Sequence, residues 1–483
     1  MNVRNIFYIS GTLLFFLGVA MVFPLCCSIY YGDGDFGALL FSIAITCITG
    51  AFFYLLFRPA DGIIALKHKE GFLIVALGWI LTSTFGSLPY LFQGVLTTFT
   101  DAFFESMSGF TTTGATVLTN IESIPRGILF WRSLTQWLGG MGIIVLSIAI
   151  FPLLGVGGMQ LYKAELPTPV KDKLTPRVRE TARTLWIVYI IISTLEFILL
   201  LFGGMDVFNA LCHTFTTMAT GGFSTGDASI GGFHSAYIDI VVTIFMLIAG
   251  INFTLHYGLL AGRLKPIIRN SELRFYLGIV IGAVILVTLS LRFNVFDDTG
   301  TSLRYASFQV VSIVTTTGYA TANFNEWPAL SKIILLLLMF IGASAGSTGG
   351  GIKCLRILLI LKQSYMELYR LIHPHAIKAI KLNSKPVSWN VMGSIWGFFV
   401  LYLAMAMSAS VVLSMLGLDL MTAFSAVAAT IGNVGPGFGA VGASSTYSEI
   451  PFFGKWVLSF CMLAGRLEIY TVIVLLVPEF WKK

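Results

Sequence analysis

Clusters of threonine and glycine recur four times along the 483-residue sequence, and their composition suits coordination of a cation. Each cluster ends in a glycine, and the four read Thr112-Thr113-Gly114, Thr220-Gly221-Gly222, Thr316-Thr317-Gly318 and Asn433-Val434-Gly435. Twelve positions before each final glycine lies an alanine, which favours Gly435 over Gly432 as the end of the fourth cluster. Repetition in a fixed register predicts one structural unit that is used four times.

Backbone oxygens are the ligands that such clusters can offer. Glycine adopts positive φ without steric cost, so successive carbonyl groups can point to the same side, and threonine adds a hydroxyl acceptor on a stiff side chain. A ring of carbonyls from four strands can replace the hydration shell of K⁺. One cluster alone would be an ordinary surface loop, but four in register predict a cation site lined by all twelve residues.

The composition places these clusters in a membrane protein. Hydrophobic residues make up 56% of the chain and charged residues 11%, with a mean hydropathy of +0.85, whereas soluble domains have about 25% charged residues. Six scattered cysteines exclude a disulfide scaffold. No Ser/His/Asp triad, carboxylate pair or His/Cys cluster has catalytic spacing, so we expect neither an enzyme nor an organic cofactor.

Apolar segments near the length needed to cross a bilayer, about 20 residues, occur ten times. They lie near 6–29, 37–58, 71–93, 128–152, 184–203, 236–261, 275–293, 330–361, 390–416 and 453–477. Of the 30 Lys and Arg residues, 23 lie at the two ends and in alternate connections, and six, Arg132 among them, in the other connections. Basic residues collect on the side that is not translocated, so both termini are expected in the cytoplasm. The net charge of +7 then reflects topology rather than binding to nucleic acid.

Four further apolar segments are too short to cross and too apolar to be free loops. They lie near 101–114, 207–222, 302–318 and 419–435, and each ends in a cluster. We interpret them as re-entrant half-helices, because irregular backbone at membrane depth must be buried in protein or line water. The expected fold is all-α, with ten spans in four non-identical helix–pore loop–helix repeats around one central pore. The expected units are two extra N-terminal transmembrane helices at 1–68, repeat 1 at 69–160, a cytoplasmic loop and repeat 2 at 161–268, repeat 3 with a broken second helix and an amphipathic segment at 269–388, and repeat 4 at 389–483.

The eighth span is interrupted by glycines, each of which costs about 1 kcal/mol in a helix. We predict a flexible plug beneath the clusters, and the alternative is a helix contact between small residues. The residues of this plug are Gly342, Gly346, Ser347, Thr348, Gly349, Gly350 and Gly351.

Arg466 lies near the middle of the last span. A charge there costs at least about 2.5–3.5 kcal/mol and marks a functional site by default. The alternative is a structural pair with a carbonyl of the cluster loops, with Glu105 or with Glu196.

The clusters in their sequence context resemble the TrkH family of bacterial Trk potassium uptake subunits, in a superfamily that includes KtrB and plant HKT proteins. The resemblance covers essentially the whole chain and rests on residues 110–116 (FTTTGAT), 218–225 (MATGGFST), 315–321 (TTTGYAT) and 432–437 (GNVGPG). It implies a potassium-selective pore with K⁺ as the transported ion and one filter strand per repeat. Glycine rather than serine at 114 goes with potassium, whereas the fourth cluster departs most from the family pattern.

The resemblance also implies that residues 342–351 form an intramembrane gating loop and that Arg466 reaches the pore as an electrostatic barrier. It implies a homodimer in the bacterial inner membrane with a cytoplasmic, nucleotide-binding regulator of the TrkA type. The basic segments 163–183 and 363–383 can hold such a regulator or anionic lipid headgroups.

The sequence leaves the mode of transport open. A channel and a proton symporter both agree with it, although no chain of intramembrane carboxylates is evident. A secondary carrier with broken helices is the alternative function, but it would show two inverted halves rather than four units in one orientation.

Overall fold

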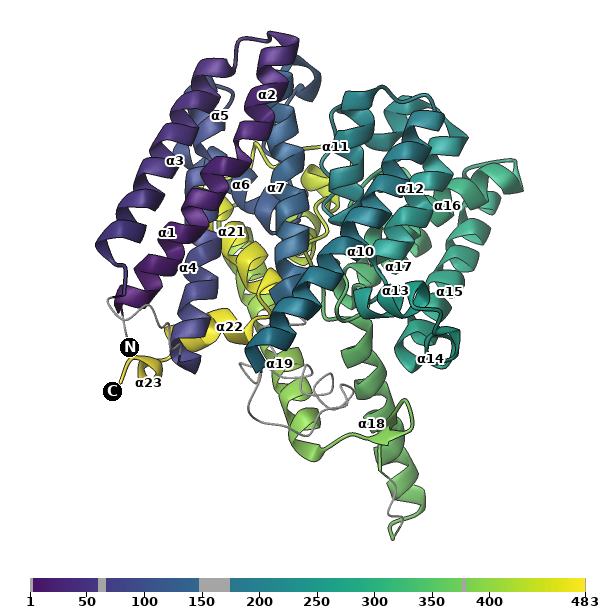
Figure 1. Cartoon of the computed structure of the whole chain (residues 1–483). Coiled ribbons are helices and arrows are strands. Elements are labelled where there is room, and N and C mark those ends of the chain that lie inside the picture. Colours follow the sequence, from purple (N-terminus) through teal and green to yellow (C-terminus); the bar gives the residue numbers. More distant parts are fainter. Residues whose placement is uncertain (1–2, 60–66, 147–173, 376–378, 483) are drawn as a thin grey trace.

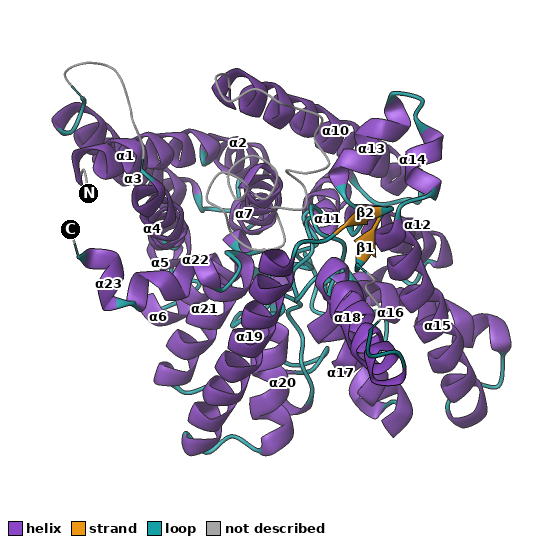
Figure 2. Cartoon of the chain, turned by 90° about the horizontal axis from the view of Figure 1, so that it is seen from below, coloured by secondary structure: helices purple, strands orange, loops and turns teal. Residues whose placement is uncertain are grey.

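The chain forms a bundle of helices around a centre of irregular backbone, as Figure 2 shows from below. The computed structural model describes residues 3–59, 67–146, 174–375 and 379–482. Within them, regular structure is helical except for the strand pair β1 (Lys381–Leu382) and β2 (Lys385–Pro386). The predicted boundary between residues 160 and 161 and most of the basic segment 163–183 lie outside the described residues.

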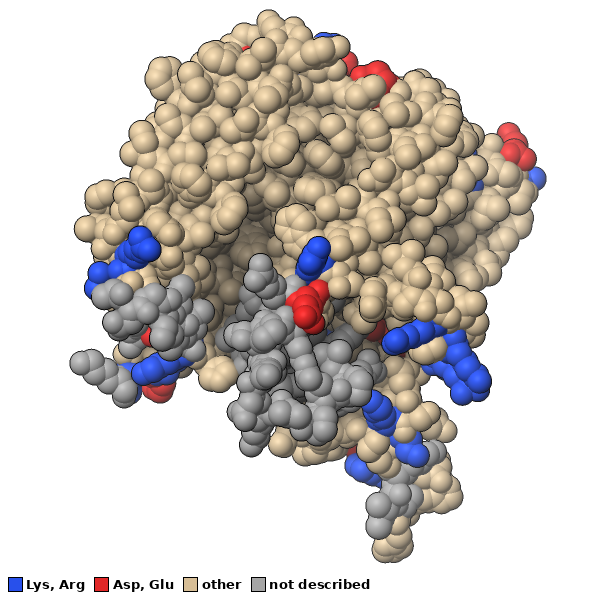
Figure 3. Space-filling model, viewed as in Figure 1, with Lys and Arg blue, Asp and Glu red and all other residues tan. Residues whose placement is uncertain are grey.

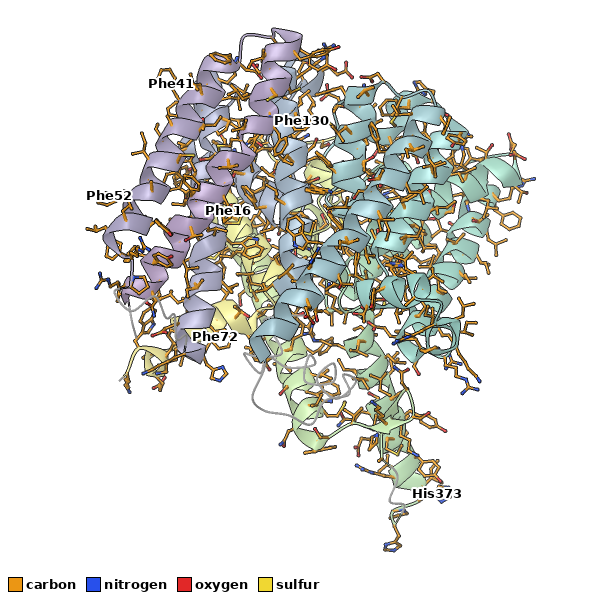
Figure 4. The ribbon with its side chains drawn as sticks, in the orientation of Figure 1. Phe16, Phe41, Phe52, Phe72, Phe130 and His373 are labelled. Carbon is orange, nitrogen blue, oxygen red and sulfur yellow. The ribbon has the colours of Figure 1, made fainter. Side chains whose placement is uncertain are left out.

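Three N-terminal helices flank the bundle: α1 (Val3–Ala20), α2 (Val22–Tyr31) and α3 (Phe36–Leu56). α1 and α3 pack closely because glycines meet, and a Cβ on Gly11 would collide with the carbonyl oxygen of Gly50. Phe16, Phe41 and Phe52 are 67%, 65% and 56% exposed on the outer side of these helices (Figure 4). Such an apolar face suits contact with lipid.

The rest of the chain repeats a pattern of long helix, short helix, irregular strand and second helix (Figure 1). The first unit is α4 (His68–Gly86), α5 (Leu88–Gln93), α6 (Phe99–Phe110) and α7 (Arg126–Val145), and the second is α10 (Leu174–Phe202), α11 (Val207–Met218), α12 (Ala236–Ala249) and α13 (Phe253–Leu260). α14 (Leu264–Ile268) leads to the third, α15 (Ser271–Asn294), α16 (Thr299–Val314), α17 (Ala329–Ile341) and α18 (Cys354–Ile372). The fourth is α19 (Trp389–Met415), α20 (Leu420–Ile431), α21 (Phe452–Arg466) and α22 (Tyr470–Ile473), followed by α23 (Pro478–Trp481).

The short helices α6, α11, α16 and α20 begin at side-chain caps. Thr98, Asp206, Asp298 and Asp419 each accept a hydrogen bond from the backbone N–H three residues later, which satisfies a donor that the helix leaves unpaired. Donors on Thr301 and Thr422 hold the pKa of Asp298 and Asp419 below the usual range of an aspartate. The local sequence therefore fixes where each short helix starts.

Six of the described helical segments are long and apolar enough to cross a membrane, or eight if each of two bent pairs is one span. The predicted spans 236–261 and 453–477 are the bent pairs, with angles of 100° between α12 and α13 and 113° after α21. Asn252 caps α13 by accepting a hydrogen bond from the Thr254 N–H at 2.8 Å, which starts a new helix axis. The count of ten spans stays a prediction.

The two ends of the chain lie at the same end of the bundle as α18 (Figure 1), and Lys69 Nζ donates to the Lys482 carbonyl at 3.0 Å. On the face in Figure 3, most Lys and Arg side chains lie in this lower half. α18 projects beyond the bundle, with His373 at its tip (Figure 4).

Candidate functional site

The four clusters share a backbone conformation that few residues adopt. The residue two positions before each final glycine has positive φ, and so does the glycine itself. For the first residue the angles are 49° at Thr112, 51° at Thr220, 61° at Thr316 and 54° at Asn433, and for the glycine they are 82° at Gly114, 76° at Gly222, 80° at Gly318 and 101° at Gly435. Positive φ is uncommon outside glycine, and its persistence marks a site that the surrounding structure holds in place.

The glycines bring the four clusters into a closed ring. A Cβ added to any of these glycines would collide with a backbone carbonyl oxygen of the next cluster, and that oxygen belongs to the residue just before the final glycine of that cluster. The four contacts are Gly114 with Gly221, Gly222 with Thr317, Gly318 with Val434 and Gly435 with Thr113. We call these glycines the ring glycines and the four facing carbonyls the ring carbonyls. Because the last contact returns to the first cluster, the four strands form a closed cycle of contacts.

Side-chain hydrogen bonds between the clusters, within a cluster and from neighbouring segments hold the ring. Asn433 Nδ2 donates to Thr113 Oγ1 at 2.9 Å and to the Met462 carbonyl at 3.0 Å. The hydroxyl groups of Thr315 and Thr317 lie 2.9 Å apart, and the Tyr447 hydroxyl donates to the Gly435 carbonyl at 2.7 Å. The fourth cluster, whose sequence departs most from the others, therefore contacts the first cluster through the side-chain amide of Asn433.

A buried ion pair supports the first cluster from behind. Arg132 Nε lies 2.7 Å from Glu105 Oε1, and the two side chains are 2% and 0% exposed. Glu105 also accepts from the Thr116 hydroxyl and the Val117 N–H at 2.9 Å, and Arg132 donates to the Ser224 carbonyl at 2.8 Å. The pair thus joins the backbones that leave the first and second clusters.

This pair corrects the assignment of Arg132 to a connection, because the residue lies inside α7. A charged residue in an apolar sequence suggests a loop when no partner for the charge is known. The partner of Arg132 is Glu105, which lies in a different helix and could not be recognised from the sequence. The same pairing excludes Glu105 as the partner of Arg466, because Glu105 is already paired with Arg132.

Residues 342–351 form a non-helical loop between α17 and α18, directly against the third and fourth clusters. The Gly350 N–H donates to Thr316 Oγ1 at 2.7 Å, and a Cβ on Gly350 would collide with the Gly432 carbonyl. On the other side, the Phe253 N–H donates to the Gly346 carbonyl at 3.0 Å. All predicted plug residues are buried here, namely Gly342, Gly346, Ser347, Thr348, Gly349, Gly350 and Gly351.

Two buried basic side chains donate hydrogen bonds to adjacent carbonyls of this loop. Arg466 Nη1 donates to the Thr348 carbonyl at 2.6 Å, and Lys353 Nζ donates to the Gly349 carbonyl. Among the described residues, Arg466 Nε and Nη2 make no hydrogen bond. Neither Glu105 nor Glu196 is the partner of Arg466, which contacts the plug rather than a cluster loop.

A second ion pair, Arg356 with Glu468, lies close by. Arg356 is in α18 and Glu468 in the bend after α21, so the pair connects the third unit to the fourth. The Arg356 guanidinium also stacks over the Phe398 ring, 4.0 Å from its centroid.

Gln136 and Glu196 are buried polar residues near the second cluster, and neither was predicted to lie there. Gln136, in α7, contacts the second cluster through its amide. Glu196, in α10, is 0% exposed, and its carboxyl group lies near the Thr217 hydroxyl of α11. A polar side chain in an apolar span was the available signal for both.

Known proteins resemble this chain over its whole length. The sequence profile of TrkH, described as a cation transport protein, matches residues 39–483. The chain is 44% identical over 487 residues to the Trk system potassium uptake protein TrkH of Salmonella typhimurium, with 100% of both chains covered. It is 38% identical over 485 residues to the Trk system potassium uptake protein TrkG of Escherichia coli, covering 100% of this chain and 99% of that protein. The crystal structure of the potassium transporter TrkH from Vibrio parahaemolyticus matches with a TM-score of 0.92 at 39% identity, with 100% of both chains covered.

Proposed function

Since the chain belongs to the TrkH family of cation transport proteins, we propose that it is the membrane subunit through which K⁺ enters the cell. The names of its relatives indicate K⁺ as the transported ion, and the ring of four clusters is the site where we expect it to bind. The observation that carries the proposal is the closure of the ring, in which each ring glycine faces a carbonyl of the neighbouring strand. A ring of carbonyls can replace the water around K⁺.

In this proposal an ion loses its water at the ring and then passes the plug of residues 342–351 on its way to the cytoplasm. The twelve cluster residues line the first step. A negative interior favours the entry of one charge by about 2.3 kcal/mol per 100 mV, so a channel needs no other driving force. The plug packs against the clusters, and its displacement opens the path.

The test is uptake of K⁺ or Rb⁺ into vesicles that contain the purified protein, with Na⁺ as competitor. We expect uptake that follows the membrane potential and is inhibited little by Na⁺. Uptake of K⁺ no faster than in empty vesicles would contradict the proposal.

Shortening the plug tests its role as a gate. Deletion of Gly346 and Ser347 removes residues that contact α13 and the loop itself rather than the clusters. We expect K⁺ flux to rise severalfold while the preference for K⁺ over Na⁺ is unchanged, measured in the same vesicles. Unchanged or abolished flux would show that the loop does not block the path.

Arg466→Ala tests the electrostatic barrier. A guanidinium charge below the ring repels an entering cation, and at an effective dielectric constant near 20 this repulsion is on the order of 1 kcal/mol, so we expect flux to rise about fivefold when the charge is removed. Arg466→Lys keeps the charge and is the matched control, with flux near that of the wild type. If both variants behave alike, the charge of Arg466 is not the barrier.

We further propose a homodimer in the inner membrane, with both termini in the cytoplasm and a nucleotide-binding regulator of the TrkA type. Two observations support a cytoplasmic partner. On the face shown in Figure 3, most Lys and Arg side chains lie toward the end that carries the termini, and α18 projects there with exposed apolar residues, namely Leu361, Tyr365, Leu368, Leu371 and Ile372. Adding the regulator to the vesicles should change K⁺ flux. The mass of the purified complex tests the dimer.

Proton-coupled uptake is a second candidate because of Glu196. An ionisable residue buried in a membrane span is a functional-site candidate by default, and proton relays built from carboxyl groups are one such function. An imposed pH gradient without a membrane potential distinguishes the two modes. Uptake of K⁺ against its own gradient would favour symport, and its absence would favour the channel.

A further inference from the structure

The four ring carbonyls are not equivalent. They belong to Thr113, Gly221, Thr317 and Val434. In the described part of the chain, only the Gly221 carbonyl accepts a hydrogen bond. No described residue donates to the other three, so no hydrogen bond offsets their negative charge.

The donor to the Gly221 carbonyl is the side-chain amide of Gln136, which is 0% exposed in α7. Gln136 Nε2 lies 2.6 Å from the carbonyl oxygen. The oxygen at the other end of the same amide accepts from the Phe223 N–H at 3.1 Å. One side chain therefore holds the residues on both sides of Gly222.

α7 lies between the first two clusters, which explains how Gln136 reaches the second. A Cβ on Gly139 would collide with the Phe110 carbonyl, and one on Gly140 would come within 2.8 Å of Ala219 Cα. This close packing leaves the glutamine few positions other than the observed one. Its amide is therefore part of the wall behind the ring.

The other three units have methionine at this place. Gln136 is the eleventh residue of α7, and the eleventh residues of α12, α17 and α21 are Met246, Met339 and Met462. Methionine cannot donate a hydrogen bond. The amide is therefore a departure from the repeat that occurs in one unit of four.

We propose that Gln136 is a positioning residue that sets ion selectivity by holding the Gly221 carbonyl. The amide fixes the direction of this carbonyl and offsets part of its negative charge. A weaker field and a ring that cannot contract both favour K⁺ over the smaller, more strongly hydrated Na⁺. This inference rests on the proposed function, because it names what tunes the same ring.

Gln136→Met gives the second strand the side chain that the other units carry. Loss of one net hydrogen bond changes an equilibrium by about two- to tenfold, so we expect the preference for K⁺ over Na⁺, measured as the ratio of the two fluxes in vesicles, to fall by about that factor. Ser133→Ala is the matched control in the same helix, since the Ser133 hydroxyl donates to the Leu129 carbonyl of its own turn and lies near Cys212, and among the described residues no hydrogen bond joins it to any of the four clusters. Its flux ratio should equal that of the wild type.

A second measurement is needed for a variant that transports too little K⁺ for a flux ratio to be measured. In detergent, K⁺ should raise the thermal unfolding temperature more than Na⁺ does, and Gln136→Met should reduce this difference. Where that variant does not accumulate, Gln136→Asn keeps an amide of shorter reach and should act in the same direction. A folded variant with the wild-type ratio and the wild-type difference overturns the inference. A wild type without K⁺ flux would instead overturn the proposed function, so the two failures are distinguishable.

Discussion

Gly222→Ala is expected to reduce K⁺ flux at least about tenfold. The added Cβ would collide with the Thr317 carbonyl oxygen, which is a ring carbonyl. The residue also has a φ of 76°, and positive φ costs an L-residue about 1–2 kcal/mol. The strand must therefore move away from its neighbour, and the ring opens. Flux of Rb⁺ into vesicles measures the effect.

Gly417→Ala is the matched control for this experiment. Gly417 has a φ of 93° after α19, and nothing lies within 4 Å of the place where its Cβ would be. The control carries the same backbone cost without the collision, so its flux should be close to that of the wild type. Equal loss in both variants would mean that backbone conformation, rather than approach of the strands, explains the defect.

Glu105→Gln is expected to reduce the free energy of unfolding by about 3–5 kcal/mol, because it leaves the buried Arg132 without a counter-ion. The wild-type pair is separated by 2.7 Å and is almost fully buried. Thermal unfolding in detergent measures the change.

The double variant Glu105→Gln and Arg132→Gln completes the experiment. It removes both charges, so it should recover part of the lost stability. A double variant whose loss equals the sum of the two single losses would show that the two side chains do not interact. Arg132→Gln alone should be severe as well, because it leaves Glu105 with only the Thr116 and Val117 donors.

The positive φ of the four ring glycines could be predicted from the sequence, whereas the positive φ of the residue two positions before each of them and the side-chain contacts could not. Glycine and its register specify where the chain needs positive φ, and these needs are local. Glu105 and Arg132 are 27 positions apart on different helices, so their pairing depends on how the helices pack. Gln136 could have been singled out by comparing the second helices of the four units, because the other three have methionine at the same position.

The straightness of the spans was predicted less well. Hydropathy alone joins residues 236–261 and 453–477 into continuous spans, but both bend sharply. The cap at Asn252 and the positive φ of Glu468, 58°, end one helix axis and begin another. Hydropathy cannot report such changes of direction because the residues on both sides remain apolar.

The four short helices have a further consequence for the ion. α6, α11, α16 and α20 each run directly into a cluster, so their carboxyl ends converge on the ring. A helix macrodipole places about half a negative charge at that end. Together the four ends attract a cation and repel chloride without any acidic side chain. This selection by sign is a property of the backbone and should survive the replacement of cluster side chains.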